Sequence, residues 1–523
     1  MKAMKVLAVL FCIAVAVSGV PALAQVQAGR IVGTVYDPAD AVVPGATVTV
    51  TNTNTNVAHS VTSNSSGDFV VTPLNPGVYD VSAALQGFQT TIDRGVELLV
   101  GQTVRLDLRL AIGETTTVLE VTAEVPLLNT DTGTVGQVIS NKQITDLPLN
   151  GRGFHELARL TPGAATVSAT GNVLRIRPEV VNSNTISGVR GSQITFLLDG
   201  ADVTEQHQGG TYIQASIDAL QEFSVQQNAY SAEFSRAGGF FNATTKSGTN
   251  EFHGALFEFL RNDKLDARGF FARDREILKR NQYGGAIGGR IFRDKTFFFV
   301  NYEAMRERVG LLFNNIVPSL AQRNGDFSRA GLNRIYDPLS QVANPAGGGA
   351  IRTQFTNNTI PQNQLSPQAV FFNDFIVQPN TGVDRAVFSP SRSVDTDQIT
   401  ARVDHQLGNS TLFGRLSWHD NRMQEPNAHP TLGIAPLNTD AQNVAIGLNT
   451  NLRPTVVNEF RFNFLPSLID LAPYLDRRDF NAEAGITGFE NILRRDGSGS
   501  FPDFTWTGYA GLRGSSFDQR PKT

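Results

Sequence analysis

Five residues between positions 190 and 233 carry the charges, or shape the turn, on which any chemistry of this stretch would depend. They are Arg190, Asp199, Gly200, Glu222 and Glu233. Either the charged groups form an acid–base set, or they form structural ion pairs that hold neighbouring parts of the fold together. The seven His are scattered, and no His-Glu-x-x-His or Gly-x-Ser-x-Gly motif occurs. We therefore favour the structural interpretation and expect no enzymatic activity.

Residue patterns typical of cofactor, metal or nucleic-acid binding are also missing from the sequence. The Asn150-Gly-Arg-Gly153 segment lacks the Lys-Ser/Thr pair of a phosphate-binding loop and is typical of a turn. The single cysteine, Cys12, lies in the N-terminal apolar run, so a mature chain would have no thiol chemistry. Without the leader, 42 of the 44 Lys and Arg remain against 48 Asp and Glu, a net charge of about −6. We expect no cofactor, no metal and no nucleic acid.

The first residues have the pattern of a secretory leader. Lys2 and Lys5 precede an apolar run over 6–17, and Ala22-Leu-Ala24 offers small residues for cleavage. The run is too short for a spanning helix, which needs ~20 residues. We predict a signal peptide over 1–24. No later stretch approaches that length, so a membrane role of the mature chain requires a barrel or a peripheral contact.

Residues 29–112 have the pattern of a small β-sandwich. Short alternating stretches at 31–36, 47–51, 67–71 and 77–81 are separated by Gly, Pro and Asp turns. The glycines, prolines and aromatics of this segment resemble a carboxypeptidase regulatory-like domain, a module that is not catalytic. His59 is the only histidine here, so a zinc peptidase is not indicated. We interpret the segment as a folded spacer or docking module.

The residue pattern of the chain changes at 244–260. Polar turn residues such as Lys246, Ser247 and Asn250 lead into a strand that carries Phe257 and Phe259 on one face. A globular plug that ends where a membrane barrel begins would produce this change. The segment 245–254 also resembles, almost letter for letter, the junction of plug and first barrel strand in Oar-like TonB-dependent outer-membrane receptors.

The resemblance extends over 125–248, which it identifies as a plug domain. Matching sequence segments lie at 147–152, 160–163, 189–192, 196–201 and 217–223. We interpret Arg190, Asp199, Glu222 and Glu233, with Gly200 in the turn, as structural and gating candidates. The charged residues would form pairs that lock the plug to the barrel wall, and a pull on the plug would loosen them. Physically, 194–198 is expected to be a buried strand that stops at Asp199-Gly200.

Residues 249–523 alternate between apolar and polar side chains, as β-strands with one apolar face do. Ile399, Ala401 and Val403 oppose Thr400, Arg402 and Asp404. Tight turns at 293–295, 407–410 and 452–455 alternate with long polar segments, expected at 304–395 and 419–441. A soluble sandwich does not explain that asymmetry, whereas an outer-membrane barrel does. The predicted fold is mostly β: a β-sandwich, an α+β plug and an incomplete transmembrane antiparallel β-barrel.

The segment 113–124 links the first domain to the plug and admits two interpretations. It is an ordinary strand or linker, or it holds a TonB box that adds as an edge strand to the periplasmic energy-coupling protein. The resemblance implies the second function for six residues: Val118, Leu119, Glu120, Val121, Thr122 and Ala123.

The resemblance implies a gated receptor or transporter in the outer membrane of a Gram-negative-type bacterium. Its partners would be a TonB-type protein, outer-membrane lipid and an unidentified extracellular ligand. The alternatives are an Oar-like structural, adhesion or export protein and, less well supported, a secreted sandwich protein. We count eight to ten strands after residue 252, whereas such a receptor has ~22, so we expect a fragment of a longer protein.

Overall fold

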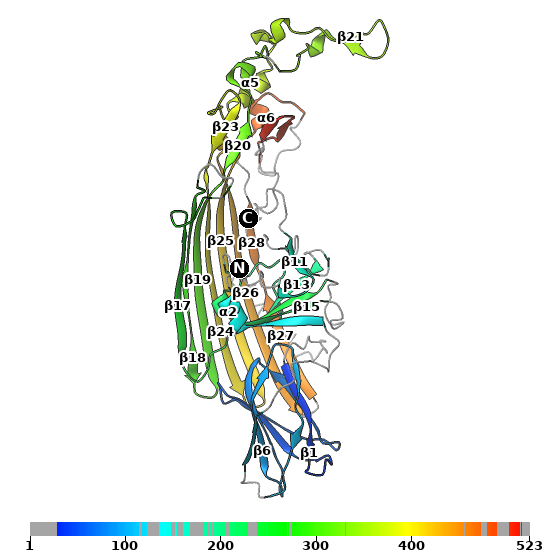
Figure 1. Cartoon of the computed structure of the whole chain (residues 1–523), viewed down its shortest axis with the longest axis vertical. Helices are drawn as coiled ribbons and strands as arrows, with labels where there is room; N and C mark the ends of the chain where they lie inside the picture. Colours follow the sequence, from blue (N-terminus) through cyan, green and yellow to red (C-terminus); the bar gives the residue numbers. More distant parts are fainter. Residues whose placement is uncertain are drawn as a thin grey trace, which may run out of the picture.

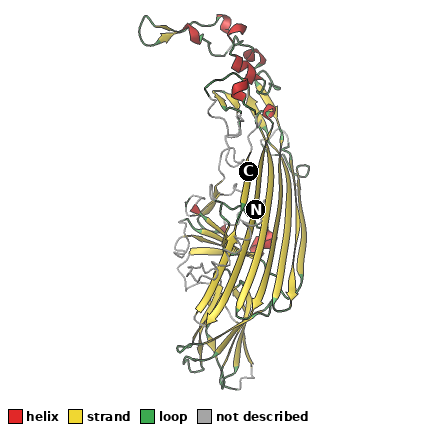
Figure 2. Cartoon of the chain, turned by 180° about the vertical axis from the view of Figure 1, so that it is seen from behind, coloured by secondary structure: helices red, strands yellow, loops and turns green. Residues whose placement is uncertain are grey.

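The computed structural model shows a sandwich, a plug sheet, a curved wall of long strands and a lobe along one long axis (Figure 1). The plug sheet lies on the concave side of the wall, and most of the helices gather in the lobe (Figure 2). The predicted signal peptide lies outside the described residues. The structure describes residues 29–113, 118–122, 135–147, 152–153, 160–167, 183–186, 188–189, 193–205, 210–227, 238–268, 270, 275–329, 331–453, 456–471, 478–488, 501–512 and 514.

The sandwich consists of two sheets that bury their apolar faces against each other. One sheet has the order β4–β1–β7, with β8 also paired to β1, and the other has the order β3–β2–β5–β6–β9. Ile31, Val48 and Val81 are among the fully buried side chains between them. The predicted β-sandwich is confirmed. Its strands are β1 (Gly29–Tyr36), β2 (Thr47–Asn52), β3 (Ala58–Thr62), β4 (Asp68–Leu74), β5 (Gly77–Ala84), β6 (Thr90–Leu98), β7 (Thr103–Arg105), β8 (Leu108–Arg109) and β9 (Val118–Thr122).

The plug sheet has five strands in the order β10–β15–β16–β13–β14. They are β10 (Val135–Ser140), β13 (Thr195–Leu198), β14 (Ala201–Asp202), β15 (Leu220–Gln227) and β16 (Phe240–Thr245), accompanied by α2 (Asn141–Asp146) and η4 (Ile217–Ala219). Phe196 and Phe241 stack with ring centres 4.8 Å apart in its core. The same core includes Val394, Met423 and Leu437 of the wall. The plug sheet is therefore packed directly on the inner face of the wall, and its core is shared with it.

The wall is an eight-stranded antiparallel sheet in the order β17–β18–β19–β24–β25–β26–β27, with β28 also paired to β26. β17 and β27 end that path within the described residues, so the sheet is an open part of a barrel. The strand number agrees with the predicted eight to ten. The strands are β17 (His253–Asn262), β18 (Leu278–Phe292), β19 (Thr296–Gly310), β24 (Ser391–Leu407), β25 (Ser410–Pro426), β26 (Ile434–Arg453), β27 (Val456–Phe464) and β28 (Ser467–Leu471).

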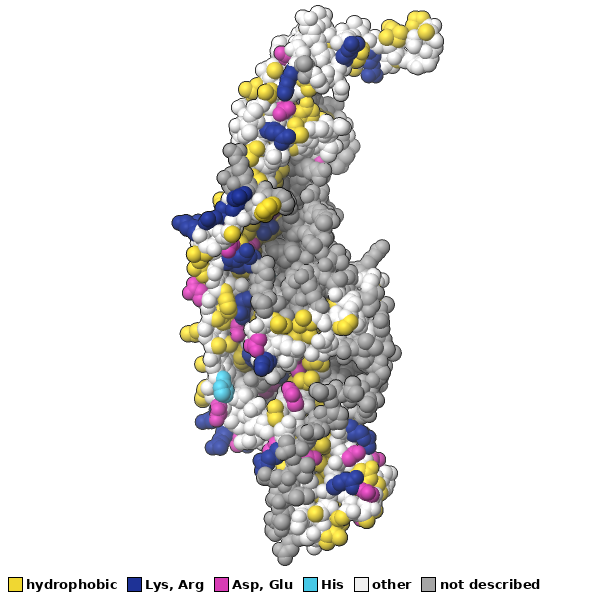
Figure 3. Space-filling model, in the orientation of Figure 1, with side chains coloured by type: hydrophobic (Ala, Val, Ile, Leu, Met, Phe, Trp, Pro, Cys, Tyr) yellow, Lys and Arg dark blue, Asp and Glu magenta, His cyan; other side chains and the backbone are white. Residues whose placement is uncertain are grey.

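The two faces of the wall differ as the alternation predicts. Thr400, Arg402 and Asp404 face inward and are buried, whereas Val403 and Leu416 face outward and are exposed. Leu256 has 93% of its surface exposed, which suits contact with lipid. In Figure 3, Lys and Arg side chains mark the two ends of the wall, and hydrophobic ones lie between them.

The tight turns at 293–295 and 407–410 lie where the sequence predicts them, and the third lies partly outside the described residues, between the end of β26 and the start of β27. The long connections are shorter than expected. The strands β19 and β24 continue to Gly310 and from Ser391, so the first connection covers only 311–390. The second expected segment, 419–441, is wrong as a loop, because β25 and β26 stay paired up to Pro426 and Ile434. Polar residues continue these strands because inner and outer faces both become polar beyond the lipid.

The connections at the far end of the wall fold into an aromatic lobe, whose described residues are 311–329, 331–390, 427–433, 478–488 and 501–512. Phe372, Phe480 and Phe501 are nearly fully buried in its core. Arg323 fixes the lobe by donating hydrogen bonds to the carbonyl oxygens of Asn373, Ile376 and Val377. Its elements are β20 (Phe313–Ile316), α4 (Leu320–Arg323), η5 (Pro338–Ser340), β21 (Val342–Ala343), β22 (Ala350–Ile351), η6 (Thr356–Asn358), η7 (Gln362–Gln364), α5 (Pro367–Asn373), β23 (Arg385–Phe388), η8 (Pro430–Leu432), α6 (Phe480–Glu483), β29 (Phe504–Trp506) and β30 (Tyr509–Leu512).

The remaining described elements are short. β11 (Ala164–Val167) and β12 (Ser183–Ile186) form a two-stranded antiparallel ribbon beside the plug sheet. Within the described residues, no helix is both long and apolar enough to cross a bilayer.

Candidate plug–barrel contact site

Asp199 lies in the tight turn that ends β13, as the sequence predicts. Both turn residues have left-handed backbones, with φ of 51° at Asp199 and 76° at Gly200. Gly200 also leaves room for the wall, because a Cβ there would force the guanidinium of Arg461 on β27 to move. The turn thus brings the backbone of the plug against the wall and aims the Asp199 carboxylate at β24 and β25.

The Asp199 carboxylate is buried, and each of its two oxygens contacts an arginine and Thr245. Its Oδ1 lies 2.8 Å from Arg402 Nη1, and its Oδ2 lies 3.0 Å from Arg415 Nε. Thr245, at the end of β16, donates from its backbone N–H (2.9 Å) and its hydroxyl (2.8 Å). Burial alone would raise the pKa of Asp199, but the charges of Arg402 and Arg415 and the bonds from Thr245 hold it below its ordinary value. The aspartate is therefore the anion that joins plug to wall.

The two arginines need this anion because they face each other. Arg402 on β24 and Arg415 on β25 are direct cross-strand partners, and both side chains are almost fully buried. Like charges in that position repel unless a counter-charge lies between them. Asp404 supplies a second one, with Oδ1 at 2.8 Å from Arg402 Nη2. We name Asp199, Arg402, Asp404 and Arg415 the Asp199 cluster.

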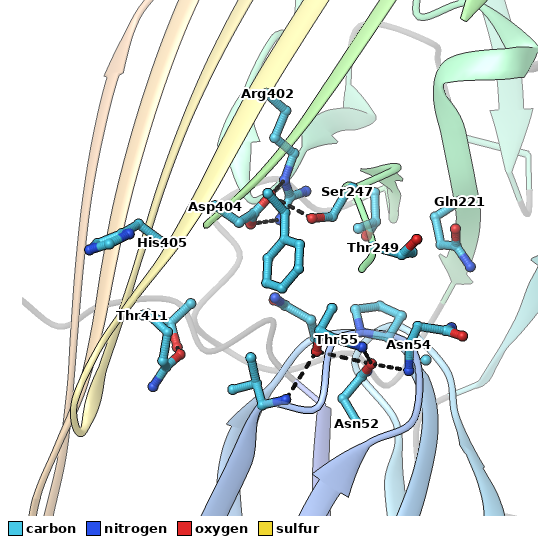
Figure 4. A pocket seen from close by; sticks show the side chains of 18 of the residues that line it. Asn52, Asn54, Thr55, Gln221, Ser247, Thr249, Arg402, Asp404, His405 and Thr411 are labelled. Carbon is cyan, nitrogen blue, oxygen red and sulfur yellow. Dashed lines mark hydrogen bonds and ion pairs between the residues drawn. The ribbon is translucent and has the colours of Figure 1, made fainter. Parts of the chain in front are cut away.

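The Asp199 cluster is extended at both sides. Ser247, where the chain leaves the plug, donates its hydroxyl to Asp404 Oδ2 at 2.7 Å (Figure 4). Arg461 donates to the backbone oxygen of Asp199 and pairs with Glu459. The Phe413 ring lies under both guanidinium groups, 5.0 Å from Arg402 and 5.8 Å from Arg461.

A second contact between plug and wall centres on Arg152, which belongs to the segment read as a simple turn. Arg152 pairs with Asp218 of the plug, and its Nε lies 3.8 Å from Glu303 Oε2 on β19. Its guanidinium carbon lies 4.5 Å and 4.6 Å from the ring centres of Phe257 and Phe259 on β17. Glu303 also accepts hydrogen bonds from Ser216 of the plug and Gln282 of β18. Arg152 thus ties the plug to the first strands of the wall.

Glu222 does not join either contact with the wall. It lies buried on β15, where Val100 and Glu97 of the sandwich are its neighbours. Burial raises its pKa to about 8, and the nearby charge of Glu97 adds to the shift. The sandwich lies beside Glu222, and the predicted role of Glu222 in locking the plug to the wall stays a prediction.

The other predicted site residues are placed only in part. Arg190 and Glu233 lie outside the described residues, as does Ala123. Val118, Leu119, Glu120, Val121 and Thr122 form β9, which pairs in parallel with β6 of the sandwich. The segment is therefore a strand at the edge of a sheet, while its predicted role as a TonB box stays a prediction.

Sequence reasoning missed the wall side of the Asp199 cluster. The signal was present, because the two-residue turn at Gly408 and Asn409 sets the register that places Arg402 opposite Arg415. Two opposed arginines on an inward face demand an anion from another element. No comparable signal pointed to Arg152.

A curved antiparallel sheet, apolar outside and charged inside, with a second sheet fixed to its inner face, defines an outer-membrane β-barrel protein with an internal plug. Residues 244–523 match the family model described as the outer membrane beta barrel domain, so the chain belongs to that family and lies in the outer membrane. Residues 30–111 match the carboxypeptidase regulatory-like domain. The predicted domain limits at 112, 124 and 248 stay predictions.

Similarity to a curated TonB-dependent transporter confirms the resemblance of the chain to that class of protein. It is 27% identical, over 301 residues, to the TonB-dependent transporter Oar of Myxococcus xanthus, covering 53% of this chain and 26% of that protein. It is also similar to the outer membrane transporter YddB from Escherichia coli (12% identity, TM-score 0.39, 64% of this chain and 39% of that one). A further similar structure is the FrpB iron transporter from Neisseria meningitidis (11% identity, TM-score 0.35, 64% and 48%). The chain thus spans about a quarter of the curated relative's length and less than half of these structures.

Proposed function

We propose that the protein is a TonB-dependent outer-membrane transporter whose plug is moved from the periplasm to let a ligand through the barrel. The observation that carries this proposal is the buried contact of Asp199 with Arg402 and Arg415. A buried ion-paired network is firm while every partner is in place, and it is lost as a unit when the two sides separate. Such a contact suits a plug that is fixed at rest and released by a pull.

The partners follow from the same proposal. A TonB-type periplasmic protein would bind the segment 118–123 by strand addition, which β9 favours because it is already extended and at a sheet edge. The exposed apolar outer face of the wall would contact outer-membrane lipid. The ligand is extracellular and its chemistry is not identified. Because the relatives named above are transporters, we include no enzymatic activity.

A second function, structural or adhesive at the cell surface or in export of large cargo, is favoured by the aromatic lobe. The part of the lobe that contains η5, β21 and β22 projects as an arm at the end of the molecule farthest from the sandwich. In this arm Leu339 is 92% exposed and Val342 is 61% exposed. Exposed apolar residues on a projecting arm are typical of a surface that meets another macromolecule. In that function the arm would matter and the segment 118–123 would not.

The two functions are separated by deleting 118–123. Cells with the wild-type gene, the deletion, and no gene are grown in one defined medium, and mass spectrometry follows every medium component. The transporter proposal expects a component whose depletion is lost equally in the last two strains. Unchanged depletion in the deletion strain, with altered surface adhesion only in the strain without the gene, would favour the structural function.

A further inference from the structure

The sandwich touches the point where the plug leads into the wall. The loop between β2 and β3 approaches this junction from below, as Asn52, Asn54 and Thr55 do in Figure 4. The backbone N–H of Asn250 donates to the backbone oxygen of Asn54 at 3.0 Å. From the same loop, Asn56 Nδ2 donates to Asp294 Oδ1 at 3.1 Å. One loop of the sandwich is thus bonded both to the plug exit and to a turn of the wall.

Asp294 is the centre of this three-way junction. It lies in the turn between β18 and β19, and its Oδ1 also accepts a hydrogen bond from Asn250 Nδ2 at 2.7 Å. Its backbone N–H in turn donates to Asn250 Oδ1 at 3.0 Å. One carboxylate therefore holds the sandwich and the plug exit against the same turn, with bonds to a charged group that are stronger than neutral ones.

The sandwich makes a second contact, with the plug sheet itself. The loop after β6 brings Val100 against the plug sheet, where it lines a small cavity together with Asn242 and Thr244 of β16. Between the β2–β3 loop, the turn between β4 and β5, the plug exit and the wall lies a cavity of about 140 Å³. It is lined by residues of all three bodies, among them Asn54, Thr249 and Arg402. The sandwich therefore covers one side of the Asp199 cluster, because the cavity beside Arg402 is closed by sandwich residues.

The segment predicted to be pulled is part of the same sandwich. β9 is bonded along its length to β6, from Thr90 opposite Val118 to Arg94 opposite Thr122. β6 ends at Leu98, two residues before Val100, which lies against the plug sheet. A force on β9 consequently reaches β6 and its contact with the plug sheet through one set of sheet hydrogen bonds.

We propose that the sandwich is a latch that closes the periplasmic mouth over the plug exit, and that a pull on β9 loads this latch before it loads the plug. For the direction of the pull, the latch rests on the proposed transport function. The closed latch itself does not, because its contacts belong to the resting protein.

The latch is tested by the reactivity of a cysteine at Thr249, which lines the cavity. The protein is purified in detergent with Thr249→Cys in a background from which all other cysteines are removed, and its reaction with a bulky maleimide is timed. Asp294→Gly and Asn56→Gly remove the bond from opposite sides, and glycine accepts the left-handed φ of 58° at both positions. We expect each to raise the labelling rate about tenfold, the effect of losing a bond to a charged group.

The matched control is Asn409→Gly in the turn between β24 and β25. Its side chain makes no hydrogen bond to the sandwich among the described residues. This variant should label at the unmodified rate. If Asp294→Gly and Asn56→Gly label at the same rate as Asn409→Gly, the latch is overturned. The transport proposal would still stand, because labelling does not involve a ligand.

The path of the pull is tested by force spectroscopy on the protein in supported membranes, with the handle on Leu119→Cys. If the pull loads the latch first, Asn56→Gly lowers the force of the first rupture, and Asn409→Gly does not. A first rupture of the same force in both variants would show that the pull bypasses the sandwich.

Discussion

Asp199 is the residue on which the attachment of the plug depends most. Replacement by Asn keeps the shape but leaves Arg402 and Arg415 opposed without their shared anion. Removal of one partner from a buried ionic network typically costs about 3–5 kcal/mol. We expect Asp199→Asn to lower the free energy of local opening of β13 and β16 by that amount, measured by hydrogen exchange.

The matched control replaces the whole cluster, with Asp199→Leu, Arg402→Met, Asp404→Leu and Arg415→Met together. Because no charge is then left unpaired, most of the lost stability should return. If Asp199→Asn exchanges as slowly as the wild type, the cluster does not hold the plug.

Glu222 gives the contact between plug sheet and sandwich a pH dependence of known sign. Its pKa is raised from 4.5 to about 8, so the folded protein holds a proton that the unfolded chain releases. Its contribution to stability is therefore complete below pH 4.5 and is lost as the pH rises through about 8. We expect the melting temperature of the contact between the sandwich and the plug sheet to fall as the pH rises over this range.

Glu222→Gln, which stays neutral at every pH, should remove this part of the pH dependence. Glu97→Gln is the control, because it removes only the neighbouring charge and should lower the midpoint without abolishing the effect. A wild-type profile in Glu222→Gln would contradict the assignment.

The strands of the wall could be predicted from the sequence because period-two alternation and tight turns leave one register. The aromatic run at 296–302 is β19, with Phe297 and Phe299 inside and Tyr302 outside. Strand ends could not be predicted, because polar residues above the lipid continue a strand as well as they form a loop. The fold of the aromatic lobe was missed for a similar reason: its phenylalanines are far apart in sequence and show no period.

The lobe should be a separately destabilised unit. Phe372 is buried and lies 5.6 Å, centre to centre, from the ring of Phe501. Phe372→Ala removes a buried ring, which costs about 3–5 kcal/mol. We expect faster proteolysis within 311–390 while the wall stays intact. Val370→Ala on the exposed side of α5 should leave the rate unchanged, and equal rates would show that the ring does not hold the lobe.

At the scale of the whole molecule, the order of bodies along the chain could be predicted, but their contacts could not. The sandwich was interpreted as a spacer or docking module, whereas it covers the plug exit through Asn54 and Asn56. Nothing in one sequence shows that Asp294, far along the chain, receives these bonds. The pairing of β9 with β6 was equally hidden, because a five-residue apolar strand has many possible neighbours.

The central claim is that the plug must leave its contacts with the wall for transport, and a covalent lock tests it most directly. Asn463 Nδ2 of β27 donates to the backbone oxygen of Asp202 in the plug at 2.8 Å. Asp202→Cys and Asn463→Cys, joined by a short bis-maleimide in cells, should stop depletion of the transported medium component. Each single-cysteine strain treated with the same reagent should deplete it normally. Depletion at the wild-type rate with the lock in place would contradict the account.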